Sequence, residues 1–162
     1  MRRGFTLVEL IVVIVILGIL AVTALPRFVD LRDDAHRSSV AGTASSFRSA
    51  VALAYAACIS RNFAGLDNLP AFGAGDVDFN ANCLPASTNG TNTLTVNAAR
   101  CLQVWNGILL PAPSISTPAT DTTEYRAQGG GTICTYTYRR DTDTVRLFTY
   151  NAATGAVAVT NP

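Results

Sequence analysis

A chain of 162 residues is long enough for one modest domain and one additional segment. Its charges nearly cancel, with 12 Lys+Arg against 11 Asp+Glu, so there is no electrostatic reason to expect nucleic acid or an anionic surface as the main partner. Only 14% of the residues are charged, against about 25% in typical soluble proteins, and this composition suits a secreted surface domain better than a cytosolic enzyme.

An apolar segment follows a short positive leader at the N-terminus. Arg2 and Arg3 precede the run FTLVELIVVIVILGILAVTAL, residues 5–25, in which Glu9 is the one charged side chain. A helix of this length spans roughly the 30 Å hydrocarbon core of a membrane. Positive residues keep their end of such a segment in the cytoplasm, so the remainder of the chain is predicted to be exported.

A cleaved signal peptide is one interpretation of this segment. Cleavage after Ala24 would satisfy the requirement for small residues at the cut. However, Pro26 lies almost at that cut, and the apolar run is longer than the usual stretch of about 7–15 residues. Placing the Glu9 carboxylate in lipid also costs free energy, and a signal peptide that is removed has no use for such a residue. The carboxylate therefore indicates a function for the helix itself.

The run Gly4-Phe5-Thr6-Leu7-Val8-Glu9-Leu10, followed by Ile, Val and Leu, resembles the prepilin signature of the type IV filament superfamily. The resemblance implies that a prepilin peptidase removes residues 1–4 by cutting after Gly4. It also implies that the enzyme methylates the new N-terminal residue, Phe5. Residues 5–25 would then stay on the mature protein as its transmembrane and polymerisation helix.

Glu9 lies about one helical turn from Phe5. After cleavage the α-amino group of Phe5 is cationic, and in a stacked filament the Glu9 carboxylate of one subunit could neutralise the amine of its neighbour. Removing one partner of a buried pair typically costs about 3–5 kcal/mol. The resemblance assigns this assembly role to Glu9, and a glutamate that reaches the membrane face is the alternative.

Pro26 is expected to end or kink the helix, because proline removes one backbone donor and crowds the preceding turn. The resemblance implies that the helix loosens there within a filament, so Pro26 is included among the assembly residues. Beyond it, apolar residues recur at intervals of mostly three and four up to Cys58. A long helix is thus predicted from Phe5 to about Ser60, with residues 26–60 as its amphipathic half. Its charged cluster is either a solvated face or a contact between subunits, and consists of Asp30, Arg32, Asp33, Asp34, Arg37 and Arg48.

Residues 61–131 are predicted to be a variable loop region, because Asn, Gly, Ala and Pro are frequent there and no period is sustained. Within it, the amphipathic stretch Ala98–Leu110 predicts a short helix that Pro111 ends. Residues 132–162 are predicted to form an antiparallel meander, with strands at Thr132–Arg139, Val145–Tyr150 and Ala156–Thr160. The predicted fold class is α+β, the type IV pilin fold, in which a small antiparallel sheet packs on the long helix.

Four cysteines stand at wide, irregular spacings: Cys58, Cys83, Cys101 and Cys134. Behind a membrane-targeting segment, an even number indicates two disulfides in an oxidising compartment. Of the three possible pairings, the layout favours Cys101–Cys134, which joins the short helix to the first strand, and Cys58–Cys83, which joins the middle loop to the end of the long helix. His36 is the single histidine and no Cys-x-x-Cys is present, so neither a metal nor a cofactor is expected.

Three further segments resemble the mannose-sensitive haemagglutinin (MSHA) pilins within this superfamily: Pro26-Arg27-Phe28, Trp105-Asn106, and Cys134-Thr135-Tyr136-Thr137-Tyr138. The resemblance implies a major structural subunit of a pilus that serves surface attachment. Its partners would be identical pilin subunits, the prepilin peptidase and the inner-membrane pilus assembly machinery. The precursor would reside in the bacterial inner membrane and the assembled pilus outside the cell.

Two alternative functions remain open at this point. A pseudopilin of a type II secretion system has the same N-terminal signature, and Asp141 and Asp143 would be its only close acidic pair for calcium near the C-terminus. A minor pilin with a ligand-binding role is the second. An enzyme is not expected, because the sequence has no second histidine, no paired carboxylates in an apolar setting and no Gly-x-Ser-x-Gly motif.

Overall fold

The computed structural model describes residues 6–161, and of residues 24–30 it describes the backbone alone. The chain forms two compact units, Met1–His36 and Arg37–Pro162. One helix, α1, runs from Leu7 to Ser60 and contributes to both units. Its end at Ser60 is where the sequence predicts it, but the helix does not end at Pro26. The missing donor costs about 3 kcal/mol, which the long helical stretches on both sides outweigh.

In the second unit, α1 packs through a stripe of buried residues spaced three or four apart: Val40, Ala44, Phe47, Val51, Ala54 and Cys58. This spacing places them on one face of a helix with 3.6 residues per turn. Phe47 lies in the middle of the stripe, and its ring centroid is 5.1–6.0 Å from the rings of Trp105, Tyr136, Phe148 and Tyr150. This aromatic cluster is the centre of the core.

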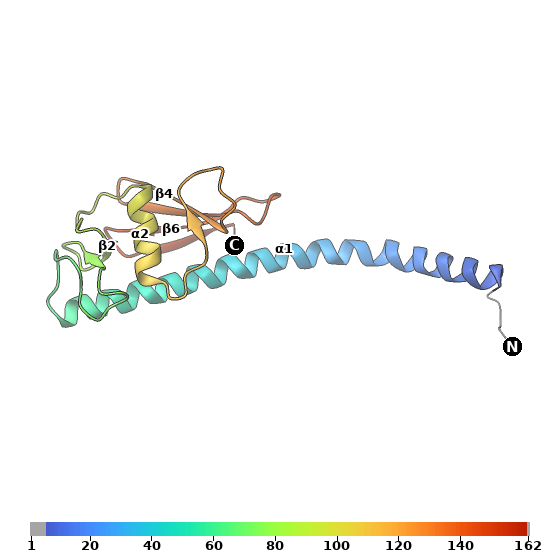
Figure 1. The fold of residues 1–162 in the computed structure, drawn as a ribbon, viewed down its shortest axis with the longest axis horizontal. Coiled ribbons are helices and arrows are strands. Elements are labelled where there is room, and N and C mark those ends of the chain that lie inside the picture. The colour runs from blue at the N-terminus through green and yellow to red at the C-terminus, as the bar shows by residue number, and fades with distance from the viewer. Residues whose placement is uncertain (1–5, 162) are drawn as a thin grey trace. The chain divides into compact units, whose positions relative to one another are not determined.

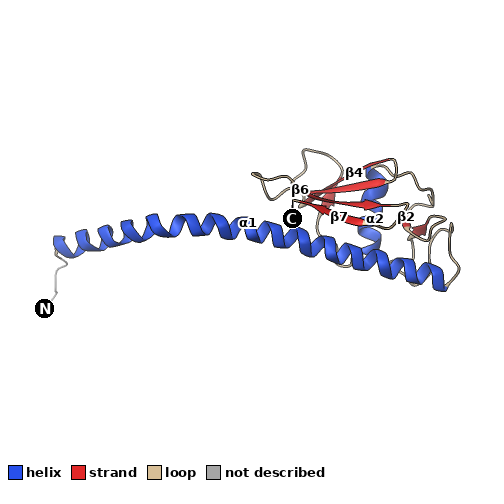
Figure 2. Ribbon diagram, turned by 180° about the vertical axis from the view of Figure 1, so that it is seen from behind, coloured by secondary structure: helices blue, strands red, loops and turns tan. Residues whose placement is uncertain are grey.

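The main sheet has five strands in the order β3-β4-β5-β6-β7, at Ile115–Ser116, Tyr125–Gly130, Ile133–Tyr138, Arg146–Asn151 and Val157–Thr160. Strands β4 to β7 are antiparallel to one another, and β3 pairs with β4 in parallel. The second half of α1 and the helix α2, Ala98–Ile108, lie on the same face of this sheet (Figures 1 and 2). The α+β fold predicted from the sequence is confirmed.

The three strands of the predicted meander are present as β5, β6 and β7. The structure differs from the prediction in residues 61–131, which contain β3, β4 and a small antiparallel pair, β1 (Asp78–Phe79) and β2 (Pro85–Ser87). Strand β4 has the sequence Tyr-Arg-Ala-Gln-Gly-Gly, whose Ala and Gly residues are poor strand formers. It is a strand because each residue from Tyr125 to Gly130 pairs with β5, so tertiary pairing outweighs local preference.

The buried carboxylate of Asp78 holds together the chain that surrounds β1 and β2. It accepts hydrogen bonds from Ser87 Oγ at 2.6 Å and from the backbone N–H groups of Asn68 and Gly90 at 3.0 and 2.8 Å. A carboxylate with three donors is stable without water. This single side chain therefore fixes two separate turns of the middle region.

The buried guanidinium of Arg100 fixes the next stretch. It donates to the backbone carbonyls of Ala86 and Thr91 at 3.3 and 3.2 Å, and also to backbone oxygens of Thr93 and Thr95. Burial lowers the pKa of Arg100, and the charge of Asp78 opposes that shift. The segment that appears structureless in the sequence is thus ordered by two buried charges, in addition to buried apolar side chains such as Leu69, Val77 and Phe79.

Candidate assembly segment

The first half of α1 exposes a continuous apolar surface. Every large apolar side chain between Leu7 and Val22 is at least 46% exposed. No helix in the part of the chain that the structure describes is both long and apolar enough to span a membrane. Exposed apolar surface of this extent marks a segment that binds a partner.

Glu9 and Thr6 form a reciprocal cap at the start of α1. The Thr6 N–H and hydroxyl donate to Glu9 Oε2 at 3.0 and 2.9 Å, and the Glu9 N–H donates to Thr6 Oγ1 at 3.2 Å. This is a capping box, in which a threonine and a glutamate three residues later satisfy two backbone donors that the helix leaves unpaired. Its signal in the sequence is the Thr-x-x-Glu spacing before an apolar run, which the predictions above did not use. Glu9 therefore has an intramolecular role in addition to the predicted contact between subunits.

The other residues predicted for processing and assembly have different positions. Gly4 and Phe5 lie outside the described residues. The backbone at Pro26 is helical, as part of α1. Of the four, Glu9 alone has a described side chain, and it stands at the N-terminal end of the helix, where the helix dipole favours a carboxylate.

Two disulfides link the elements of the second unit. Cys58, in the last turn of α1, is joined to Cys83, and Cys101 of α2 is joined to Cys134 of β5. The Cα atoms are 5.5 Å apart in both bridges, as expected for a disulfide. This is the pairing that the layout of the sequence favours. Each bridge contributes about 2–4 kcal/mol by restricting the unfolded chain.

Asp141 and Asp143 lie between β5 and β6. Asp141 Oδ1 accepts from the backbone N–H groups of Asp143 and Thr144 at 3.0 and 3.1 Å, and its Oδ2 accepts from Arg146 Nε at 2.7 Å. Both carboxylate oxygens of Asp141 therefore accept hydrogen bonds, and Arg146 neutralises the charge of the carboxylate. No group of three or more His, Cys, Asp or Glu side chains that could hold a metal ion is found among residues 6–161. The Asp141 side chain thus stabilises the turn that contains the acidic pair.

The pH dependence of stability tests this turn. The hydrogen bond from Arg146 holds the pKa of Asp141 below its ordinary value of about 3.9. Because the folded-state pKa is depressed, the stabilisation is present above about pH 4 and is lost as the pH falls through the folded-state pKa. Asp141→Asn is expected to lower the Tm near pH 7, and its difference from wild type is expected to shrink toward about pH 2. Thermal unfolding of the full chain in detergent, followed by circular dichroism, measures both differences.

Asp143→Asn is the matched control for this measurement, because Asp143 is an exposed carboxylate in the same turn. Its Tm should follow the wild-type value at both pH values. If Asp141→Asn instead shows the same Tm difference at low and neutral pH, the carboxylate of Asp141 does not stabilise the turn through its charge.

Comparison with known proteins covers only part of the chain. The family model described as "prokaryotic N-terminal methylation motif" matches residues 1–25. The chain is also 58% identical over 52 residues to the "Type IV narrow pilus major component PilA5" of Thermus thermophilus. That alignment covers 32% of this chain and 45% of the relative, so the chain spans less than half of the relative's length. No solved structure matches the chain.

The motif, the similar pilin and the fold agree with one another. The methylation motif includes Gly4, Phe5 and Glu9 at the spacing on which the resemblance to prepilins was based. The long N-terminal helix, the small antiparallel sheet and the two disulfides agree with the α+β fold of these proteins. The chain is thus similar to type IV pilins in its N-terminal motif, and its fold agrees with theirs.

Proposed function

We propose that this chain is a structural subunit of a type IV pilus that assembles through residues 5–25. The observation that supports this most strongly is that the methylation motif contains the capped start of α1 and its exposed apolar side chains. Such a surface must be covered by lipid or by protein. In the proposal it is covered first by the inner membrane, and then by the same helix of other subunits in an extracellular filament.

Processing precedes assembly in this proposal. A prepilin peptidase cuts between Gly4 and Phe5 and methylates the amine of Phe5, and the inner-membrane assembly machinery then extracts the subunit. Glu9 of one subunit pairs with the Phe5 amine of a neighbour, which relieves two charges that would otherwise be buried alone. The intramolecular bonds from Thr6 support this role, because they fix the carboxylate at the end of the helix where a neighbour's amine would approach.

We further propose that the subunit is a major pilin of MSHA-like type that serves surface attachment. The residues on which that resemblance rests include Trp105, Cys134 and Tyr136, all of which are fully buried. The rings of Trp105 and Tyr136 pack against Phe47, and Cys134 forms the disulfide with Cys101 of α2. Their burial supports a second unit that is built like the globular domain of MSHA pilins. The similar Thermus protein is named a major component of its own pilus.

The two alternatives differ from this proposal in observable ways. A secretion pseudopilin is disfavoured by the two disulfides and by Asp141, whose oxygens are held by the turn and Arg146. A minor pilin would have the same helix and differ in abundance. An enzyme is disfavoured by the N-terminal methylation motif and by the similarity to a protein named as a pilus component.

Electron microscopy of sheared surface filaments, labelled with an antibody to this chain, tests the proposed function. A major pilin is expected to be labelled along the whole filament and to be its most abundant protein by mass spectrometry. Labelling confined to filament tips would instead support the minor pilin. If filaments contain no copy of this chain, the proposed function is wrong.

A further inference from the structure

We propose that the second unit, residues 37–162, binds a second copy of itself head to tail. The turn Thr142–Val145 of one subunit would dock into a groove between α1 and the β6–β7 turn of the next. This inference rests on the proposed function and deepens it, because it names a contact between subunits outside the N-terminal helix.

The groove has a volume of about 430 Å³. It is lined by residues from α1, the β1–β2 connection and the β6–β7 turn: Arg48, Val51, Ala52, Tyr55, Asn82, Leu84, Ala153, Thr154 and Gly155. Its floor is apolar, with the buried side chains of Val51 and Leu84. Gly155 allows the β6–β7 turn to lie close to Leu84, because a Cβ at this position would be only 2.9 Å from the Leu84 side chain.

Arg48 gives the groove its charge. Among the described residues that line the groove, it is the single ionised side chain. Its Nη2 donates to the carbonyl of Val157 at 2.9 Å, which holds the guanidinium against the edge strand β7. The remaining N–H groups of an exposed, positioned guanidinium suit a carboxylate from another molecule.

The turn Thr142–Val145 has complementary properties. Val145 is 66% exposed, which is unusual for a β-branched apolar side chain beside a strand. Asp143, two residues earlier, is an exposed carboxylate, whereas Asp141 is already neutralised by Arg146. The bonds from Asp143 and Thr144 to Asp141 fix the turn before any partner binds, and a rigid segment loses little entropy on docking. Val145 can therefore fill an apolar groove while Asp143 meets Arg48.

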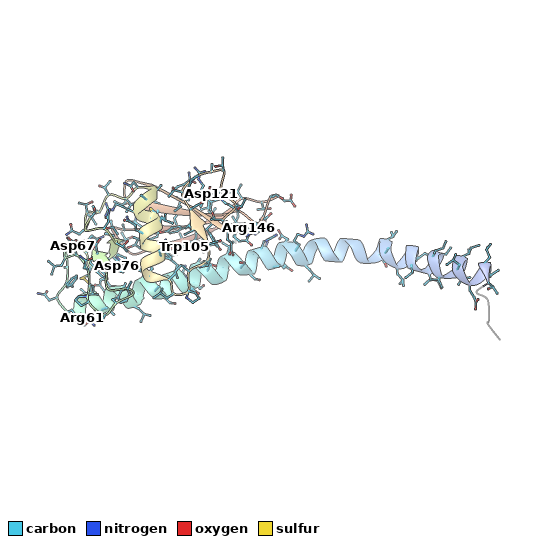
Figure 3. All side chains as sticks on the ribbon, in the orientation of Figure 1. Arg61, Asp67, Asp76, Trp105, Asp121 and Arg146 are labelled. Atoms are coloured by element: carbon cyan, nitrogen blue, oxygen red, sulfur yellow. A yellow bond between two sulfur atoms is a disulfide. The ribbon has the colours of Figure 1, made fainter. Side chains whose placement is uncertain are left out.

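The two surfaces lie at opposite ends of the same strand. Strand β6 begins at Arg146, directly after Val145, and ends at Asn151, directly before the turn that lines the groove. Figure 3 shows Arg146 near one end of this unit and Arg61, which follows α1, near the other. A contact between opposite ends of identical molecules is heterologous, and such contacts produce closed rings or, where the rotation between subunits does not close, open helical filaments. The second outcome is the one that a pilus requires.

A single turn in a groove is smaller than the interfaces that hold stable dimers, so the contact is not expected to form between isolated subunits. In a filament already held by its N-terminal helices, the second unit of the neighbouring subunit is present at a high effective concentration. The same weak contact is then repeated at every subunit.

Cysteine cross-linking tests this contact directly. Two differently tagged copies of the full chain, one with Val145→Cys and one with Ala52→Cys, are produced together, and sheared filaments are treated with a mild oxidant. All four native cysteines are already in disulfides, so the new thiols are the reactive ones. A dimer that carries both tags is expected on a non-reducing gel.

The matched control replaces Ala52→Cys with Ser45→Cys. Ser45 is also small and exposed, and it lies two helical turns away on the same side of α1, about 10 Å from Ala52. The control pair is expected to give at least several-fold less dimer. Filaments that contain both Val145→Cys and Ala52→Cys copies without a doubly tagged dimer, or with equal dimer in the control, would overturn the inference and leave the proposed function standing. Absence of the chain from filaments would refute both.

Charge reversal gives a second measurement. Arg48→Glu and Asp143→Arg are each expected to reduce the assembled fraction several-fold, since like charges then face each other. The double variant is expected to recover most of that loss. Because Arg48 also bonds Val157 within the subunit, the recovery is the decisive result, and a double variant no better than Arg48→Glu alone would contradict the contact.

Discussion

Replacing Glu9 with glutamine is expected to leave the precursor processed and the helix capped, but to reduce pilus assembly a hundredfold or more. Glutamine can take the glutamate position in a capping box, so the bonds with Thr6 survive the change. Glu9→Gln does, however, remove the negative charge that neutralises a neighbour's Phe5 amine. An unpaired buried charge costs about 3–5 kcal/mol, which is a factor of a hundred or more in an equilibrium constant. The measurement is the ratio of sheared filament protein to the mature pool in the membrane.

Thr6→Val is the matched variant, because it removes the capping hydroxyl and leaves the carboxylate. It is expected to cost about 0.5–2 kcal/mol of helix stability and to reduce assembly far less than Glu9→Gln. If the two variants assemble equally poorly, Glu9 acts through the cap and not through a contact between subunits. Normal amounts of filament from Glu9→Gln would likewise contradict the charge pair.

Gly129→Ala is expected to disrupt the packing of α2 on the sheet. A Cβ at this position would lie 2.6 Å from Asn97 C, 2.7 Å from Asn97 O and 2.7 Å from Cys101 Sγ. Backbone atoms at the start of α2 cannot move without moving the helix and its disulfide to Cys134. Overpacking of this kind typically costs about 1–3 kcal/mol, and a clash with backbone belongs at the upper end. Thermal unfolding of the full chain in detergent measures the loss.

Gly130→Ala is the control, because Gly130 is the next residue of β4 and a Cβ there meets no atom within 4 Å. Its Tm is expected to stay close to the wild-type value. Equal Tm values for the two variants would show that the close approach of β4 to α2 is not a constraint on the fold.

The helix, the meander and the disulfide pairing were predictable because their signals are local and repeated. The stripe from Val40 to Cys58 repeats at helical spacing. In β5 every second residue is buried, and these residues are Cys134, Tyr136 and Tyr138. The disulfide between α2 and β5 follows from placing the short helix beside the first predicted strand. These features depend on periods of two and 3.6 residues, which a single sequence displays.

The features that were missed depend on contacts that no regular spacing along the chain displays. Asp78 and Arg100 are ordinary charged residues in a loop-like sequence, and only the structure brings backbone groups from residues 68–95 around them. Strand β4 has weak local preference and exists through its pairing with β5. The groove at Arg48 likewise combines three separate segments. The capping box of Thr6 is different, because its spacing was visible in the sequence.

Mass spectrometry of the mature N-terminus, on protein from sheared filaments, tests the central claim most directly. The chain contains no lysine, so the α-amino group is the mature protein's one primary or methylated amine and its modification can be assigned without ambiguity. A chain that begins at Phe5 and carries one added methyl group is the expected result. A mature chain that begins at Leu25, or one that retains Met1, would contradict a pilin assembled through residues 5–25.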